Sequence, residues 1–103
     1  MRLTYPTSLV LHALLQGHHH GFDIMDAVGL PSGTVYPILR RLDTEGLVTS
    51  RWEKEGVARR EQRPPRRYYE LTAAGRILAQ EAASRYRAIQ DVAPAAGSTG
   101  LDQ

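Results

Sequence analysis

The chain has 103 residues, 42% of them hydrophobic, and it contains no cysteine. That length suits one small core and excludes two independent domains, and the lack of cysteine excludes disulfides, thiolate chemistry and cysteine-containing metal sites. Because the formal net charge is only +2, any affinity for an anionic partner must come from how the charges are distributed.

The first predicted element is a mostly buried helix over about residues 7–16. Its apolar residues recur at helical spacing, at Val10, Leu11, Leu14 and Leu15. Three consecutive histidines, His18 to His20, follow it. Adjacent side chains in a short loop do not readily converge on one ion, and metal ligands usually come from separate elements or from i and i+4 on a helix. We therefore expect no metal site and no cofactor here.

A second, short helix is predicted over residues 21–28. Its apolar candidates are Phe22, Ile24, Met25 and Val28. An aromatic residue and a methionine at this spacing are typical of a core-facing side, so we interpret Phe22 as a core residue. Gly29 can adopt the left-handed conformation that ends such a helix.

The stretch from Gly29 to Val48 combines a turn, an amphipathic helix and a stop. One side of the helix is an apolar stripe, formed at i, i+3, i+4 and i+7 by Val35, Ile38, Leu39 and Leu42. The opposite side and its flanks carry small, aromatic and cationic residues, namely Gly33, Tyr36, Pro37, Arg40, Arg41 and Thr44. Such a surface suits a DNA groove, so we interpret this segment as a recognition helix. Pro37 lacks an amide hydrogen, and we expect it to kink or loosen the first turn.

Two antiparallel strands are predicted after this helix, over about residues 47–54 and 67–71, because apolar residues alternate there. The segment between them contains Gly56, Pro64 and Pro65, which favour an exposed loop over a continued ladder. From residue 59 to 67 there is one acid, Glu61, against five arginines: Arg59, Arg60, Arg63, Arg66 and Arg67. We interpret the loop as a wing that contacts DNA phosphates or the minor groove. The alternative is a solvated charged loop.

A last helix is predicted from Ala73 to about Asp91, with Thr72 as its cap. One side of it gathers four residues within a narrow arc: Leu78, Ala82, Tyr86 and Ile89. We expect this stripe to be a dimer interface, although the helix could instead fold back on its own domain. The composition of the chain's end predicts a disordered tail. The expected division is therefore a winged helix-turn-helix at 1–72, a dimerisation helix at 73–92 and a tail at 93–103.

Taken together, three sequence stretches resemble the PadR family of winged-helix transcriptional regulators. They are LPSGTVYPILRRLDTEGLV, HGFDI upstream of it and RRYYELTAAG downstream of it. The resemblance spans roughly residues 7–90, with a shorter second helix and with Pro-Ser-Gly where the family more often has Ser-Pro-Gly. It implies a mainly α fold with a small β-hairpin, that is, a winged helix-turn-helix followed by a C-terminal dimerisation helix.

The function that we expect is sequence-specific binding of double-stranded DNA by a homodimer on a palindromic operator. The resemblance implies a repressor that leaves its operator when an effector arrives, and the dimer interface is the natural place for that effector. The expected DNA-binding residues are Ser32, Gly33, Thr34, Tyr36, Pro37, Arg40 and Arg41 on the helix, and Arg59, Arg60, Arg63, Arg66 and Arg67 on the wing.

Other functions are less well supported by the residues. A winged helix used for protein–protein contact with an acidic partner is the alternative. An enzyme is not expected, because neither a Gly-rich phosphate loop nor a Ser-containing elbow motif is found. No apolar run approaches the ~18 residues of a membrane span and no secretion signal is found at the N-terminus, so we expect a cytoplasmic protein without a membrane partner.

Overall fold

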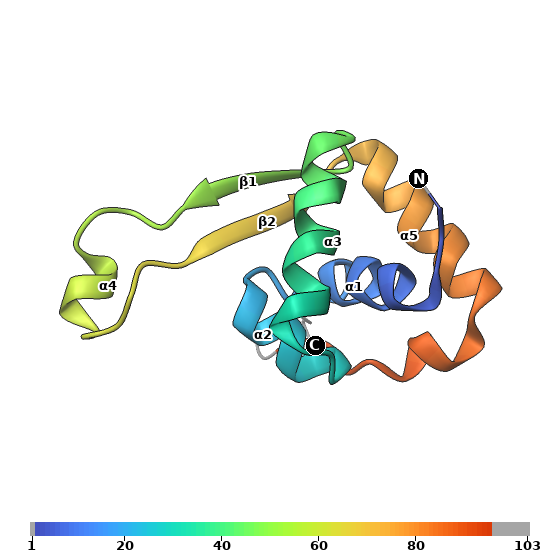
Figure 1. Cartoon of the computed structure of the whole chain (residues 1–103), viewed down its shortest axis with the longest axis horizontal. Coiled ribbons are helices and arrows are strands. Elements are labelled where there is room, and N and C mark those ends of the chain that lie inside the picture. The colour runs from blue at the N-terminus through green and yellow to red at the C-terminus, as the bar shows by residue number, and fades with distance from the viewer. Residues whose placement is uncertain (1, 96–103) are drawn as a thin grey trace, which may run out of the picture.

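The computed structural model describes residues 2–95, and it consists of a helical body from which a long hairpin extends (Figure 1). In chain order its elements are α1 (Tyr5–Leu15), α2 (Gly21–Val28), α3 (Ser32–Thr44), β1 (Val48–Trp52), α4 (Val57–Arg60), β2 (Arg67–Leu71), α5 (Ala73–Arg85) and the 3₁₀ helix η1 (Arg87–Asp91). The mainly α fold with one small hairpin, predicted from the sequence, is confirmed.

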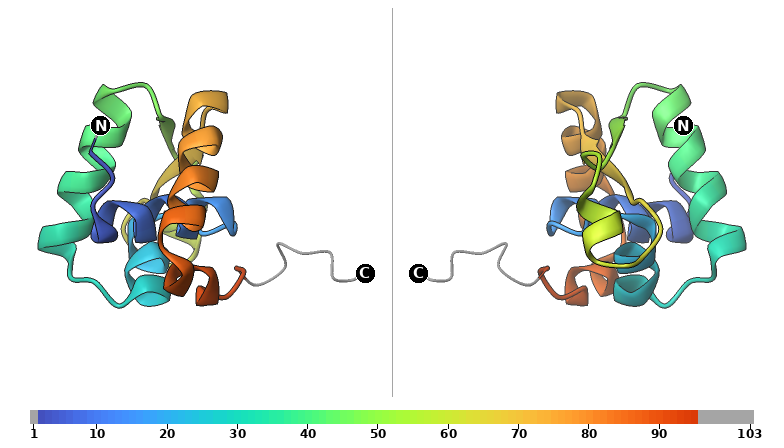
Figure 2. Two further views of the ribbon diagram at one scale, coloured as in Figure 1. Left: turned by 90° about the vertical axis from the view of Figure 1, so that its right-hand side faces the viewer. Right: turned by 90° about the vertical axis from the view of Figure 1, so that its left-hand side faces the viewer.

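The central helix is α1, which is buried without interruption from Thr7 to Leu14. It contacts α2, α3, α5, β2 and η1, and α3 and α5 lie on opposite sides of it (Figure 2). The hydroxyl groups at its start are satisfied locally, since the Ser8 hydroxyl donates to the Thr4 carbonyl over 2.8 Å and the Thr4 hydroxyl caps the first turn.

The helix-turn-helix consists of α2 and α3. Gly29 ends α2 in the left-handed conformation, at φ 71°, and its amide donates to the carbonyl of Met25. Contrary to the sequence prediction, α3 is α-helical from its first turn and continues across Pro37. Gly33 and Pro37 both lie on the exposed side, so the carbonyl that loses its amide partner can be solvated by water.

The hairpin pairs β1 with β2 in antiparallel register, from Val48 opposite Leu71 to Trp52 opposite Arg67. The histidine loop lies along the other edge of β2, where the amide of Tyr69 donates to the carbonyl of His19 over 2.7 Å. The loop therefore continues the sheet, and it holds the hairpin against the end of α1.

The C-terminal helix is shorter than the sequence predicts, because Tyr86 is extended, at φ −123° and ψ 95°, and separates α5 from η1. The four residues expected at a dimer interface pack inside the chain. Ala82 and Ile89 are fully buried, and Leu78 and Tyr86 pack against the same core. The Tyr86 hydroxyl also donates to the carbonyl of Leu3. In the single chain the stripe therefore follows the alternative in which the helix folds back on its own domain, and residues 73–92 share the core of the winged helix.

The beginning of the predicted disordered tail is bound to the rest of the chain. The carbonyl of Ala93 lies 2.7 Å from Nε2 of His18, and the amide of Ala95 donates to the carbonyl of Gln16. Residues 96–103 of that tail lie outside the described part of the chain. Among residues 2–95, no helix is long and apolar enough to cross a bilayer.

The packing of η1 predicts how stability responds to mutation. Ile89→Ala removes a fully buried side chain, so we expect it to lower the free energy of unfolding by about 2 to 5 kcal/mol. Ile77→Ala is the matched control, because Ile77 is 67% exposed, and it should change stability by less than about 0.5 kcal/mol. Urea denaturation of dilute protein measures both. Equal losses would show that η1 is not part of the core.

Candidate nucleic-acid interface

The recognition helix α3 is fixed to the core by one side and exposes the other. Val35, Leu39 and Leu42 are fully buried and Ile38 is nearly so, as the sequence predicts. Of the seven α3 residues expected to bind DNA, Thr34 is half-buried and the other six lie on the exposed side: Ser32, Gly33, Tyr36, Pro37, Arg40 and Arg41.

The first turn of α3 is built without a side-chain cap. Pro31 occupies the N-cap position, and its carbonyl accepts from the amides of Thr34 and Val35. The exposed leading end of this 13-residue helix carries backbone amides and the positive end of the helix dipole. Phosphate groups are favourable ligands at such an end.

The ring of Tyr36 packs against Gly21 at the start of α2. A Cβ atom added to Gly21 would lie 2.6 Å from Cζ of Tyr36, so only glycine allows the ring to lie against the start of α2. Tyr36 is nonetheless 42% exposed. The tyrosine therefore presents part of its side chain at the junction of the two helices. Sequence reasoning did not identify Gly21, because its role depends on a contact between two helices.

A polar junction joins α3 to the hairpin. The Ser50 hydroxyl donates to Asp43 over 3.3 Å, and Arg67 donates to Ser50 over 2.8 Å and lies 3.6 Å from the same carboxylate. These contacts help to determine the angle between the recognition helix and the hairpin. Arg67, expected to bind DNA, is thus also an internal contact, although its side chain remains 44% exposed.

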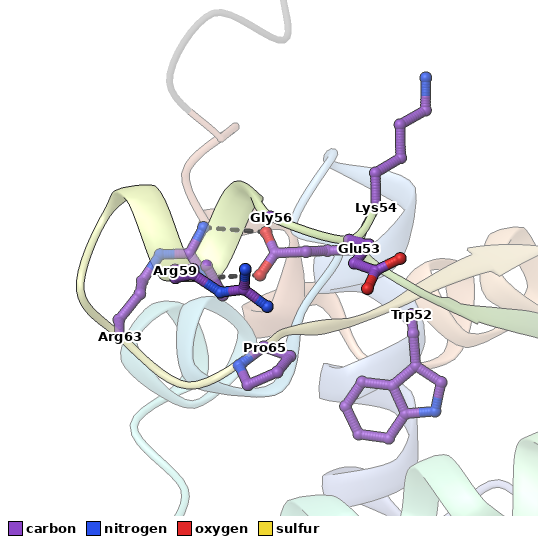
Figure 3. Close-up of a pocket in the computed structure, with 9 residues that line it drawn as sticks. Trp52, Glu53, Lys54, Gly56, Arg59, Arg63 and Pro65 are labelled. Atoms are coloured by element: carbon purple, nitrogen blue, oxygen red, sulfur yellow. Dashed lines mark hydrogen bonds and ion pairs between the residues drawn. The ribbon is translucent and has the colours of Figure 1, made fainter.

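The wing, defined here as residues 53–66 between the strands, is organised by Glu53. Arg63 donates to both carboxylate oxygens of Glu53, over 2.7 and 2.9 Å, as Figure 3 shows. The amide of Arg66 donates to the same carboxylate over 2.9 Å, and the Tyr68 hydroxyl lies 3.4 Å from it. The Glu53 side chain is only 4% exposed, and these donors, Arg63 first, lower its pKa from 4.5 to about 2.

The five arginines between residues 59 and 67 therefore have different roles. Arg63 is 19% exposed and is bound to Glu53 and Glu61, so it holds the wing in shape, and its role as a DNA ligand stays a prediction. Glu53 raises the pKa of Arg63. Arg59 and Arg60 are exposed on the short helix α4, a turn of helix where the sequence predicts an open loop.

The histidine loop is a structural element. His18 lies between the carboxylate of Asp23, at 2.9 Å from Nδ1, and the carbonyl of Ala93. His19 contacts the carbonyl of Tyr69, and His20 lies edge-on to Tyr68. Burial, with a smaller contribution from Arg66, lowers the pKa of His20. Within the described part of the chain, no three metal-ligating side chains are grouped as a metal site.

An exposed recognition helix, seated on a helical core and joined to a hairpin wing, defines a winged helix-turn-helix protein. The family model of the PadR-like transcriptional regulators matches residues 10–81, more than half of the chain. The chain belongs to this family, and it is a PadR-family transcriptional regulator.

Solved structures are similar to this chain over most of its length. A PadR family regulator from Clostridium difficile R20291 has 26% identity and a TM-score of 0.68, and the match covers 86% of this chain and 94% of that one. A PadR family regulator from Eggerthella lenta also has 26% identity, with a TM-score of 0.58 and coverage of 82% and 76%. The circadian clock associated protein Pex from Anabaena shares the fold, at 22% identity, TM-score 0.65 and coverage of 81% and 75%. No curated protein matches the chain.

The environment of Glu53 predicts how the wing responds to acid. Its pKa in the folded chain, about 2, lies below the ordinary value of 4.5. Its contribution to wing order is therefore complete above pH 4.5 and is lost as the pH falls toward 2. We expect the fluorescence of the adjacent Trp52, the chain's one tryptophan, to change over that window. In Glu53→Gln, which cannot ionise, the signal should stay flat there. An identical transition in that variant would assign the change to other carboxylates.

Proposed function

We propose that this PadR-family regulator binds a palindromic operator as a homodimer and represses transcription until an effector releases it. A regulator of this kind acts on the chromosome, so we assign it to the cytoplasm. The observation that carries the proposal is the division of α3 between four core residues and an exposed side of small, aromatic and cationic residues. Because four buried side chains fix α3 to the core, the side chains on its exposed side are held in defined positions, and readout of base edges requires such positions.

In this proposal the residues of α3 have separate tasks. Arg40 and Arg41 contact base edges or phosphates, and Tyr36 and Ser32 contact the backbone with their hydroxyl groups. Gly33 is supported as a point of close approach, because nothing lies within 4 Å of the place where its Cβ would be. Arg59 and Arg60, exposed on α4, contribute affinity that does not depend on sequence.

A dimer is proposed because one helix-turn-helix reads only a few base pairs, and two of them about 34 Å apart read a palindrome. With the first predicted stripe buried in the core, the outward side of α5 is the candidate contact. Ile77 is 67% exposed there, and the small residues around it, Ala73, Ala74 and Ser84, are exposed as well. Small side chains let two helices approach closely. An effector bound between the two copies would alter the separation of the recognition helices.

The first test selects a duplex from a random DNA pool with the purified protein and then measures binding of variants by fluorescence anisotropy at fixed salt. Arg40→Ala should weaken binding to the selected duplex by about 1 to 3 kcal/mol. Its fold should remain intact because Arg40 is exposed. Undiminished affinity in this variant, or selection of no sequence at all, would contradict the proposal.

Gly33→Ala tests whether loss of DNA affinity can be separated from loss of stability. Alanine replaces glycine inside an exposed helix, where nothing obstructs it, so the free protein should gain up to about 1 kcal/mol of stability. DNA affinity should nevertheless fall, because the methyl group occupies the surface that approaches the groove. Opposite changes in stability and affinity cannot be explained by misfolding.

The dimer is tested by Ile77→Glu. Because Ile77 lies outside the core of the single chain, the variant should fold but sediment as a monomer. Its operator affinity should fall at least tenfold, or about 1.4 kcal/mol, since the two half-sites would no longer be bound together. Gln80→Glu adds the same charge to the exposed surface of α5 without removing an apolar group, and should remain dimeric. A persistent dimer in Ile77→Glu would place the interface elsewhere.

A further inference from the structure

A cleft of about 590 Å³ lies between the hairpin on one side and the helix-turn-helix on the other. Four elements contribute to its lining, which includes Phe22 of α2, Tyr36 of α3, Trp52 of β1, Arg67 of β2 and, from the wing, Pro65 and Arg66. We call it the aromatic cleft. Figure 3 shows Trp52 pointing away from the Glu53–Arg63 pair, on the side of the hairpin that also carries Arg67 and Tyr69.

The two largest apolar side chains of the cleft are left in solvent. Phe22 is 74% exposed, although its position in the sequence predicts a core residue, and Trp52 is 62% exposed. Helix α2 is short and uses Ile24 to reach the core, so Phe22 projects outward from its first turn. Large aromatic side chains from separate elements that gather around one cleft mark a surface that is covered when a partner binds.

The charge of the cleft is positive. The guanidinium of Arg67 lies 5.7 Å from the centre of the Trp52 ring, and Arg66 lines the same wall. The lining of the cleft includes no acid. Arg67 lies 3.6 Å from Asp43 but keeps 44% of its side chain exposed. A partner that suits the cleft is therefore anionic and also offers apolar surface.

We propose that the aromatic cleft holds the sugar–phosphate backbone of one strand of duplex DNA where that strand passes between the recognition helix and the wing. Phe22 and Trp52 pack against deoxyribose rings, while Arg66 and Arg67 contact the phosphates on either side. The inference rests on the proposed function, because it gives the path of one strand across the same surface. The contacts of Phe22 and Trp52 with deoxyribose would contribute affinity that does not depend on salt, in addition to the electrostatic affinity of the arginines.

Because Trp52 is the only tryptophan of the chain, tryptophan fluorescence comes from one residue, and that residue lines the cleft. Acrylamide, a neutral quencher, should quench Trp52 readily in the full-length protein and at least threefold less at saturation with the selected duplex. Anisotropy of a dye on the same duplex measures binding independently. An unlabelled duplex is used for the quenching arm, so that energy transfer to the dye does not contribute.

Variants separate the apolar contact from the ionic one. Phe22→Ala should lower affinity about tenfold, in keeping with the loss of one buried aromatic contact, and it should leave the slope of log K against log salt unchanged. Arg66→Ala keeps the backbone amide that donates to Glu53, and it should flatten that slope by up to ~0.9. Trp52→Phe should retain more affinity than Trp52→Ala. Thr49→Ala, exposed on the opposite side of β1, is the control and should bind normally.

The outcomes distinguish the two levels of the proposal. Duplex binding with Trp52 as accessible to acrylamide as in the free protein overturns the cleft assignment and leaves the proposed function standing. Normal affinity in both Phe22→Ala and Trp52→Ala would also overturn the cleft assignment and leave the proposed function standing. The exposed aromatic side chains would then be assigned to a protein partner. Absence of duplex binding removes the proposed function, and the cleft assignment with it.

Discussion

The burial of α1 on every side is the constraint on which the rest of the structure depends. A helix buried from Thr7 to Leu14 must be covered all round, and in this chain the covering is shared by α2, α3, α5, β2 and η1. Each of these elements contributes apolar side chains to the core around α1, so the surface that we propose for DNA is formed by the residues on their outward sides. The C-terminal helix is needed for this covering, which is why its apolar stripe is not available to a partner.

Polar contacts fix the hairpin at two places, at its root beside α3 and where the wing begins. At the root, Asp43 binds Ser50 and Arg67 and so relates the strands to α3. Where the wing begins, one nearly buried carboxylate, Glu53, accepts from donors 10 to 15 positions away in the sequence. A two-stranded hairpin alone is marginally stable, and these polar contacts give it a defined direction. In the sequence the wing stands out by its arginines, but the acid Glu53 determines the shape of the wing.

The spacing of apolar residues in the sequence is sufficient to predict the helices and strands that repeat a regular pattern. The stripe of α3 predicted that helix and its buried side correctly, and the alternation predicted the two strands, because local spacing decides these features. The alternation did not predict which strand residues are buried, since Trp52 is 62% exposed. The sequence could not reveal whether the stripe of α5 meets its own core or a second copy, since both options bury the same residues. It also could not pair Glu53 with Arg63 or Gly21 with Tyr36, because those partners are brought together by the hairpin and by the packing of α2 on α3. The bounds of α2 agree with the prediction, but Phe22 is exposed because the packing of α2 turns Ile24 toward the core, and spacing alone does not decide that orientation.

The contact of His18 with Ala93 has a consequence for how the chain assembles. It joins residues 75 positions apart, so it closes most of the polypeptide into a loop. Closing so long a loop costs entropy, and the contact offsets that cost only once the helices on which the segment rests have formed. The residues from 93 to 95 should therefore be placed last during folding. For the same reason they can detach as a local unit while the central helix stays protected against hydrogen exchange.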